Sequence, residues 1–175
     1  HRPNRRQRQM CIRDRGMTRA SKFYYPDCLK VGINEKGNQV FKLDVLTELN
    51  NISHNAHDAM GDVDATIEIA KILQKNSNKV WNAGLKNNNK IDVDNFLIQN
   101  NIVCMDEYLF GKFNVHAVTY ICKNQFNYPQ CFDLLHDPLE YIDMSIKDLK
   151  IKMKQKPKLI KEIKNNKNPI LLDIS

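Results

Sequence analysis

The sequence predicts a mixed α/β chain in which a helical unit, ending near residue 79, precedes a small β-rich unit that begins near residue 101. Two observations carry this prediction. Residues 57–76 place apolar side chains at three- and four-residue steps, the period of an amphipathic helix. From residue 101 on, segments rich in β-branched and aromatic residues alternate with turn residues, as short strands do. The asparagine-rich stretch between the units, residues 80–100, is expected to be a linker with short helices.

Composition excludes several classes of protein. With 42% hydrophobic residues the chain can bury a core, yet no apolar run is long enough for a membrane span, so no membrane contact is expected. The five cysteines are odd in number, scattered and without a C-x-x-C pair. This pattern argues against a zinc ribbon or a disulfide scaffold. It indicates reduced thiols and a cytoplasmic location.

Most of the positive charge lies at the start of the chain. Residues 1–15 carry six arginines against one aspartate, a net of +5 out of the formal +7, which leaves +2 for the rest. The stretch "RQRQMCIRDR" resembles translated sequencing-adaptor read-through, so residues 1–15 are expected to be a non-native or disordered leader and are set aside from the fold. The alternative is a genuine basic arm that binds phosphates. Net charge alone therefore does not make this a nucleic-acid-binding protein.

The first unit is expected to begin with a loop-like segment, 17–39, which contains the chain breakers Pro26, Gly32 and Gly37. Residues 40–51 predict a short strand or turn that enters a helix, and the pair Asn50-Asn51 ends it. The leucines of this helix should share one face: Leu43, Leu46 and Leu49. The long helix that follows should bury one stripe, made of Met60, Val63, Ile67, Ala70 and either Ile69 or Leu73.

In the second unit, strands are expected at 101–108, 114–124 and 128–136, with a turn at 109–113, and a last strand at 168–175. Ser145 and Asp148 have the spacing of a capping box before the segment "LKIKMKQK". The lysines of the longer stretch "LKIKMKQKPKLIKEIK", residues 149–164, are interpreted as one polar face of a helix, with a track for a phosphate backbone as the alternative. The aromatic residues are expected in the core of the β-rich unit rather than on a base-stacking surface: Trp81, Tyr108, Phe110 and Phe113.

The most chemically loaded stretch is "HNAHDAMGD", residues 54–62. His57 and Asp62 are five residues apart and would not share a face of one continuous helix. If the helix begins at Asp58, which caps it, His57 can fold back over the first turn toward the same side as Asp62. The pair would then reach one water and one metal ion. Mg²⁺ prefers carboxylate oxygens, and a histidine near neutral pKa can deprotonate such a water.

This stretch also carries a resemblance. H-x-x-x-x-D at the start of a helix, here "AHDAMGD", resembles the third motif of the DEDDh (DnaQ-like) 3′→5′ exonucleases. The segments "TRASKFYYPD", "FKLDVLTELNNI", "NAHDAMGDVDATIEIAK" and "LFGKF" follow in order the layout of the bacterial exodeoxyribonuclease I family within them. The resemblance implies the C-terminal part of a ribonuclease H-like exonuclease domain over residues 16–79. It also implies an incomplete, β-rich SH3-like barrel domain over residues 101–175.

The resemblance further implies roles for four residues. His57 would be the general base, Asp62 a metal ligand, and Lys42 and Asn55 would contact the substrate strand. Two Mg²⁺ ions would assist hydrolysis that releases nucleoside 5′-monophosphates from the 3′ end of single-stranded DNA. A monomer that acts in DNA repair and recombination is implied, with a single-strand-binding protein as a partner.

The sequence departs from the family pattern, which leaves alternatives open. The Asp-x-Glu pair of the first motif and the Asp of the second are not present, and neither is the family's helical domain. The chain is therefore expected to be an inactive part of such an enzyme. The alternatives are a non-catalytic nucleic-acid-binding module and an RNA-directed DEDDh exonuclease. His54 is expected to be a surface residue, His116 and His136 structural, and Asp64 and Glu68 solvated.

Overall fold

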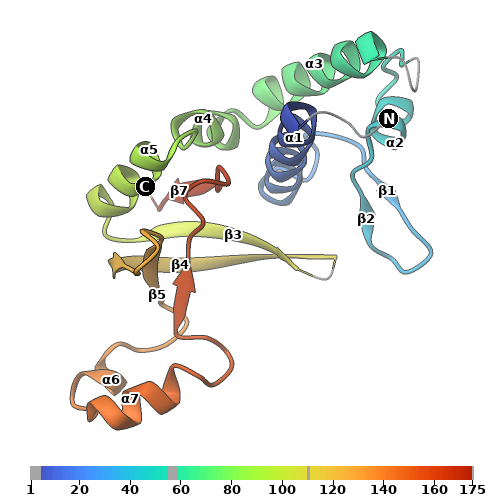
Figure 1. Ribbon diagram of the computed structural model, residues 1–175. Coiled ribbons are helices and arrows are strands. Elements are labelled where there is room, and N and C mark those ends of the chain that lie inside the picture. The colour runs from blue at the N-terminus through green and yellow to red at the C-terminus, as the bar shows by residue number, and fades with distance from the viewer. Residues whose placement is uncertain (1–4, 55–58, 110, 175) are drawn as a thin grey trace. The chain divides into compact units, whose positions relative to one another are not determined.

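The computed structural model describes residues 5–54, 59–109 and 111–174 (Figure 1). They form two compact units. The first comprises the residues up to Leu85 together with Tyr108–Phe113, and the second comprises Lys86–Glu107 and Asn114 onward. The expected linker, 80–100, is therefore divided between the two units. None of the described helices is long and apolar enough to cross a membrane.

The first unit is mainly helical. Its elements are α1 (Arg5–Tyr24), β1 (Gly32–Ile33), β2 (Gln39–Val40), α2 (Leu43–Leu49), α3 (Ala59–Asn76) and α4 (Asn78–Lys86). β1 and β2 form a small antiparallel hairpin whose turn contains Gly37 at φ +75°, a backbone conformation that favours glycine. As predicted, α2 ends at the asparagine pair: Asn50 is its C-cap and Asn51 adopts φ +55°.

The expectation of a loop from residue 17 on is wrong, because α1 extends to Tyr24. Its buried face consists of small side chains, Thr18, Ala20 and Ser21, rather than the apolar stripe by which an amphipathic helix is recognised. Ser21 accepts a hydrogen bond of 2.8 Å from the Ser77 hydroxyl, so the contact made here is polar as well as close. The helix also continues through the leader segment, back to Arg5.

The long helix α3 lies where the sequence predicts it, but only part of the predicted stripe is buried. Ile69 and Leu73 are buried, together with Ala65, which was not predicted, whereas the predicted Met60, Val63 and Ile67 are exposed. Both sets have helical spacing, so periodicity alone does not distinguish them. The core that selects the first set joins α3 to α2 and to the segment after α1; its buried members are Cys28, Leu29, Leu46, Ile69 and Leu73.

The second unit contains a five-stranded sheet. Its elements are α5 (Lys90–Gln99), β3 (Val103–Leu109), β4 (Lys112–Lys123), β5 (Pro129–Asp133), α6 (Leu139–Ile142), α7 (Ile146–Lys152), β6 (Ile160–Glu162) and β7 (Leu171–Asp173). The strand order is β6-β5-β4-β3-β7, and β3–β7, β4–β5 and β5–β6 pair antiparallel. α5 packs Val93 and Leu97 against side chains of the sheet. The expected strands and the turn at Gly111 (φ +82°) are thus confirmed.

Three expectations for this region need correction. The sheet is open, so the described residues do not show a closed barrel. Trp81 packs against the core of the first unit, Tyr108 and Phe113 also belong to that unit, and Phe110 lies outside the described residues. None of the three described residues is in the core cluster of the second unit. The capping box holds, since Ser145 accepts from the Asp148 amide, but α7 ends at Lys152. Lys154, Lys156 and Lys158 therefore do not lie on a helix face.

Asp106 on β3 makes the stability of the protein depend on pH. Burial raises the pKa of its carboxyl to about 6, although backbone amides of Asp106 and Ile170 favour the anion. The folded chain holds this proton more tightly than the unfolded chain, whose carboxyl has a pKa of about 3.9. The resulting stabilisation, roughly 3 kcal/mol, is present below pH ~4 and is lost as the pH rises through ~6.

We therefore expect Asp106→Asn to raise the free energy of unfolding at pH 8 by about 1–3 kcal/mol relative to the parent and to change it little at pH ~4. Urea titrations at the two pH values measure this difference. Asp27→Asn is the control, because Asp27 is exposed. A parent protein whose stability does not fall between these pH values would contradict the assignment.

Candidate functional site

The candidate site lies at the start of α3, where Asp62 is held by a histidine. Nε2 of His54 lies 2.8 Å from Oδ1 of Asp62 and donates to it. On the other side of the ring, Nδ1 lies 3.3 Å from the hydroxyl of Thr47 on α2. That hydroxyl is buried and also lies 2.9 Å from the carbonyl oxygens of Leu43 and Asp44. A hydrogen-bonded chain thus runs from α2 through His54 to the first turn of α3.

This arrangement corrects the expectation that His54 is a surface residue. Its side chain is only 8% exposed, and both ring nitrogens face polar atoms. The sequence offered no signal for this role, since His54 lies outside α3 and helical periodicity does not relate it to Asp62. Only the tertiary structure brings the ring and the carboxylate together.

Asp62 is placed to bind a ligand. Its side chain is 54% exposed, so the carboxylate can accept from His54 and still present an oxygen to solvent. Carboxylate oxygen suits Mg²⁺, and a hydrogen bond from a second residue commonly orients such a ligand. In the part of the chain that the structure describes, however, no three His, Cys, Asp or Glu side chains gather to hold a metal. Asp62 therefore fits one position of a metal site, and the described residues do not complete it.

The structure places only one of the other three predicted site residues. His57 and Asn55 lie outside the described residues, as does the expected cap Asp58. Lys42 is the N-cap residue of α2; its side chain is exposed and has no partner among the residues described. Its backbone carbonyl accepts from the Leu46 amide at 2.9 Å, so the start of α2 fixes its position in the chain.

The residues predicted to be solvated or structural behave accordingly. Asp64 is exposed, and Glu68 pairs with Lys71 at 2.6 Å on the exposed face of α3. His116 joins a charged cluster in the second unit: its Nδ1 lies 3.0 Å from the buried Asp133, and Lys161 lies 3.3 Å from its Nε2. The His136 ring packs edge-on against Tyr141.

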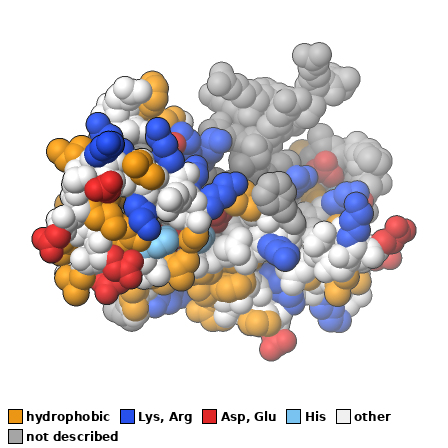
Figure 2. Space-filling view, turned by 90° about the horizontal axis from the view of Figure 1, so that it is seen from below, with side chains coloured by type: hydrophobic (Ala, Val, Ile, Leu, Met, Phe, Trp, Pro, Cys, Tyr) orange, Lys and Arg blue, Asp and Glu red, His pale blue; other side chains and the backbone are white. Residues whose placement is uncertain are grey.

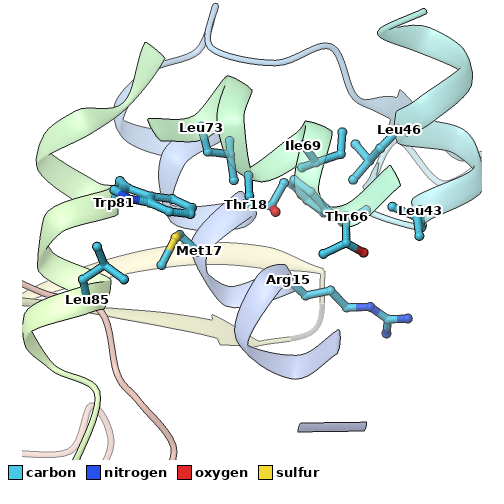
Figure 3. A pocket seen from close by; sticks show the side chains of 12 residues that line it. Arg15, Met17, Thr18, Leu43, Leu46, Thr66, Ile69, Leu73, Trp81 and Leu85 are labelled. Atoms are coloured by element: carbon cyan, nitrogen blue, oxygen red, sulfur yellow. The ribbon is translucent and has the colours of Figure 1, made fainter. Parts of the chain in front are cut away.

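An apolar cavity of about 220 Å³ also lies within the first unit (Figure 3). Trp81 and Leu85 of α4 line one side, and Leu43 and Leu46 of α2 line another. Apart from Arg15, no charged side chain lines it, and it contains no carboxylate, imidazole or thiol. It therefore cannot supply acid–base or metal chemistry, which sets it apart from the Asp62 site.

A basic and aromatic cluster that the sequence analysis missed also lies in the first unit. The Arg19 guanidinium lies 3.9 Å above the Tyr108 ring, and Phe23 stacks on Phe113 with ring centroids 4.6 Å apart. Burial lowers the pKa of Arg19, which still remains a cation at neutral pH. These contacts hold residues 108–113 against α1 and explain why that segment belongs to the first unit.

Comparisons with known proteins agree with the motif. No family model matches the chain. Exodeoxyribonuclease I of Buchnera aphidicola (subspecies Schizaphis graminum) is 47% identical over 70 residues, which cover 36% of this chain and 14% of that protein. The same enzyme of Haemophilus influenzae is 34% identical over 79 residues, 45% of this chain and 17% of that protein.

Solved structures extend the similarity over most of the chain. Exonuclease I of Methylocaldum szegediense superposes with a TM-score of 0.66 at 24% identity, covering 90% of this chain and 37% of that one. E. coli exonuclease I in complex with a dA16 oligonucleotide superposes at 0.64 and 21% identity, covering 93% and 38%. At these identities the superpositions show a shared fold.

The chain is thus similar to exodeoxyribonucleases as a class. Within that class the similarity is to part of bacterial exodeoxyribonuclease I, as the motif residues indicated. The chain spans less than a fifth of the length of the curated relatives it matches.

Proposed function

We propose that these residues belong to an exonuclease that degrades single-stranded DNA from its 3′ end and releases nucleoside 5′-monophosphates. The observation that carries the proposal is the placement of Asp62, in the "AHDAMGD" segment, at the exposed first turn of α3 with its carboxylate oriented by His54. The similarity to exodeoxyribonuclease I supports it, because one such relative is 47% identical to this chain over 70 residues.

In this proposal Asp62 is a ligand of Mg²⁺, of which the complete site holds two. When bound, the ions supply Lewis-acid stabilisation of the attacking and leaving oxygens. His57 accepts the proton of the attacking water. Lys42 and Asn55 contact the substrate strand. His54 acts through Asp62 by fixing the carboxylate, as a positioning residue.

The second unit is proposed to be an SH3-like domain that accompanies the exonuclease domain. Its antiparallel five-stranded sheet and the superposition on exonuclease I support this assignment. Among the solved relatives is an ExoI/SSB-Ct complex, so a single-strand-binding protein is proposed as a partner of the intact enzyme.

The full-length protein that contains these residues should shorten 5′-labelled single-stranded DNA from the 3′ end. The reaction should require Mg²⁺ and stop when EDTA is added. An RNA oligonucleotide of the same sequence tests the RNA-directed alternative. Absence of shortening would favour the non-catalytic nucleic-acid-binding module, and faster shortening of RNA would favour the RNA-directed enzyme.

The 175-residue chain by itself is expected to release no nucleotides under the same conditions. The reason is that Asp62 lacks companion ligands among the described residues, and two-metal hydrolysis needs several carboxylates. Mg²⁺-dependent release by this chain that disappears in His57→Ala would refute the expectation.

A further inference from the structure

The segment between β5 and β6 carries a concentration of unpaired positive charge. Residues 146–158, called here the lysine arm, contain six lysines and one aspartate, a net charge of +5: Lys147, Lys150, Lys152, Lys154, Lys156 and Lys158. All six side chains are exposed. Within the described parts of the chain, none of the six lysine side chains has a carboxylate within ion-pair distance or any other hydrogen-bond partner.

Three other lysines of the same unit are paired. Lys123 contacts Asp94 at 2.6 Å, Lys164 pairs with Glu162, and Lys161 lies near Asp133 and Glu107. The one aspartate of the arm, Asp148, accepts from the Ser145 hydroxyl at 2.6 Å at the start of α7 and offsets only one of the six lysine charges. The arm therefore keeps its charge available for an external partner.

The arm extends from a fixed base. The Asp133 amide donates to the Leu159 carbonyl at 2.8 Å, and the Leu134 amide donates to the Ala117 carbonyl at 2.8 Å, so both ends of the segment between β5 and β6, which contains the arm, join the sheet. Neither α6 nor α7 buries a residue. In Figure 1 the two helices project from the strands, and at the left of Figure 2 basic side chains (Lys or Arg) lie among exposed hydrophobic ones. Ile146, Ile151 and Met153 are exposed apolar residues of the arm.

We propose that the lysine arm binds the phosphate backbone of single-stranded DNA, at a site separate from the residues assigned to catalysis. Lysine is a compact point charge, suited to phosphate contacts without sequence preference. The apolar side chains between the lysines offer surfaces on which unpaired bases can rest. A membrane surface fits less well, since interfacial helices present a long apolar face and α6 and α7 have four and seven residues.

The choice of single-stranded DNA as the ligand rests on the proposed function, which brings that polymer to the chain. Attachment through several lysines gives a definite signature, because each phosphate contact on a single strand lowers the slope of log K against log salt by about 0.7. The test is fluorescence anisotropy of a labelled oligo-dT with the 175-residue chain in EDTA, between about 50 and 200 mM sodium chloride. No hydrolysis occurs under these conditions.

The arm variant replaces Lys152, Lys154, Lys156 and Lys158 with glutamine. The control variant makes the same change at four exposed lysines elsewhere: Lys30, Lys36, Lys75 and Lys90. Both lose the same charge. We expect the arm variant to reduce the magnitude of the salt slope by about 3 and to weaken binding at least about tenfold at low salt, and the control to change the slope by less than about 1. Circular dichroism should show both variants folded.

Equal weakening in both variants would mean that only net charge matters and would overturn the proposal. An arm variant that binds DNA like the parent would also overturn the proposal. If that variant had at the same time lost binding to phosphatidylserine vesicles, the arm would be assigned to a membrane surface instead. The proposed function can fail separately. If the full-length protein does not degrade DNA but the salt slope depends on the arm, the proposed binding site is supported and the proposed exonuclease activity is refuted.

Discussion

Asp62→Asn in the full-length protein is expected to lower kcat/KM for single-stranded DNA by about 10³-fold. Loss of one carboxylate charge weakens metal binding, and the metal supplies the main stabilisation of charge in the transition state. His57→Ala should have a comparable effect, within the range of 10²–10⁴ that a general base contributes. Initial rates with labelled oligonucleotides measure both.

Asp64→Asn is the matched control for Asp62→Asn. It removes the same charge from the same helix at an exposed position, and it should change kcat/KM less than about twofold. If the two variants lose activity equally, Asp62 is not a metal ligand.

His54→Ala should produce an intermediate loss of about 10- to 100-fold, the usual effect of removing a residue that orients a metal ligand. His54→Gln should recover part of it, because the glutamine amide can donate to Asp62. A second readout does not depend on catalysis. Without the His54–Asp62 bond, amide hydrogen exchange in the first turn of α3 should become faster. Unchanged exchange together with unchanged activity would remove His54 from the site.

Leu97→Ala is expected to destabilise the second unit by about 3 kcal/mol. Leu97 is 1% exposed and packs in the cluster that joins α5 to the sheet, so truncation leaves a cavity between them. Ile98→Ala, the neighbouring substitution on the same helix, removes a side chain that is 59% exposed and should cost less than about 1 kcal/mol. Urea denaturation followed by circular dichroism measures both. Equal losses would show that α5 does not cover the sheet as described.

Several elements were predictable because their signals are local. The period of α3, the asparagines that end α2, the capping box of α7 and the glycine turn between β3 and β4 depend on residues a few positions apart. The same locality made "AHDAMGD" recognisable, since its residues are consecutive in the sequence. Helix α1 was missed because its buried face is small and polar, so its amphipathic period is weak.

Local spacing, by contrast, does not identify which face of a helix or strand packs against the rest of the protein. Two stripes of α3 have helical spacing, and only packing against Leu29 and Leu46 selects the one with Ile69 and Leu73. Likewise, Tyr108 and Phe113 read as core residues of the β-rich unit, but their contacts with Arg19 and Phe23 place them in the first.

The sequence by itself predicted His57 and Asp62 as the residues of the candidate site, and it determined most of the helix and strand segments. The tertiary structure alone decided that His54 holds Asp62 and that the lysines of residues 146–158 lack the carboxylate partners found by other lysines of their unit. The physical reason is distance along the chain. A hydrogen bond or ion pair between residues far apart in sequence exists only when packing brings the two groups together, and no periodicity records it.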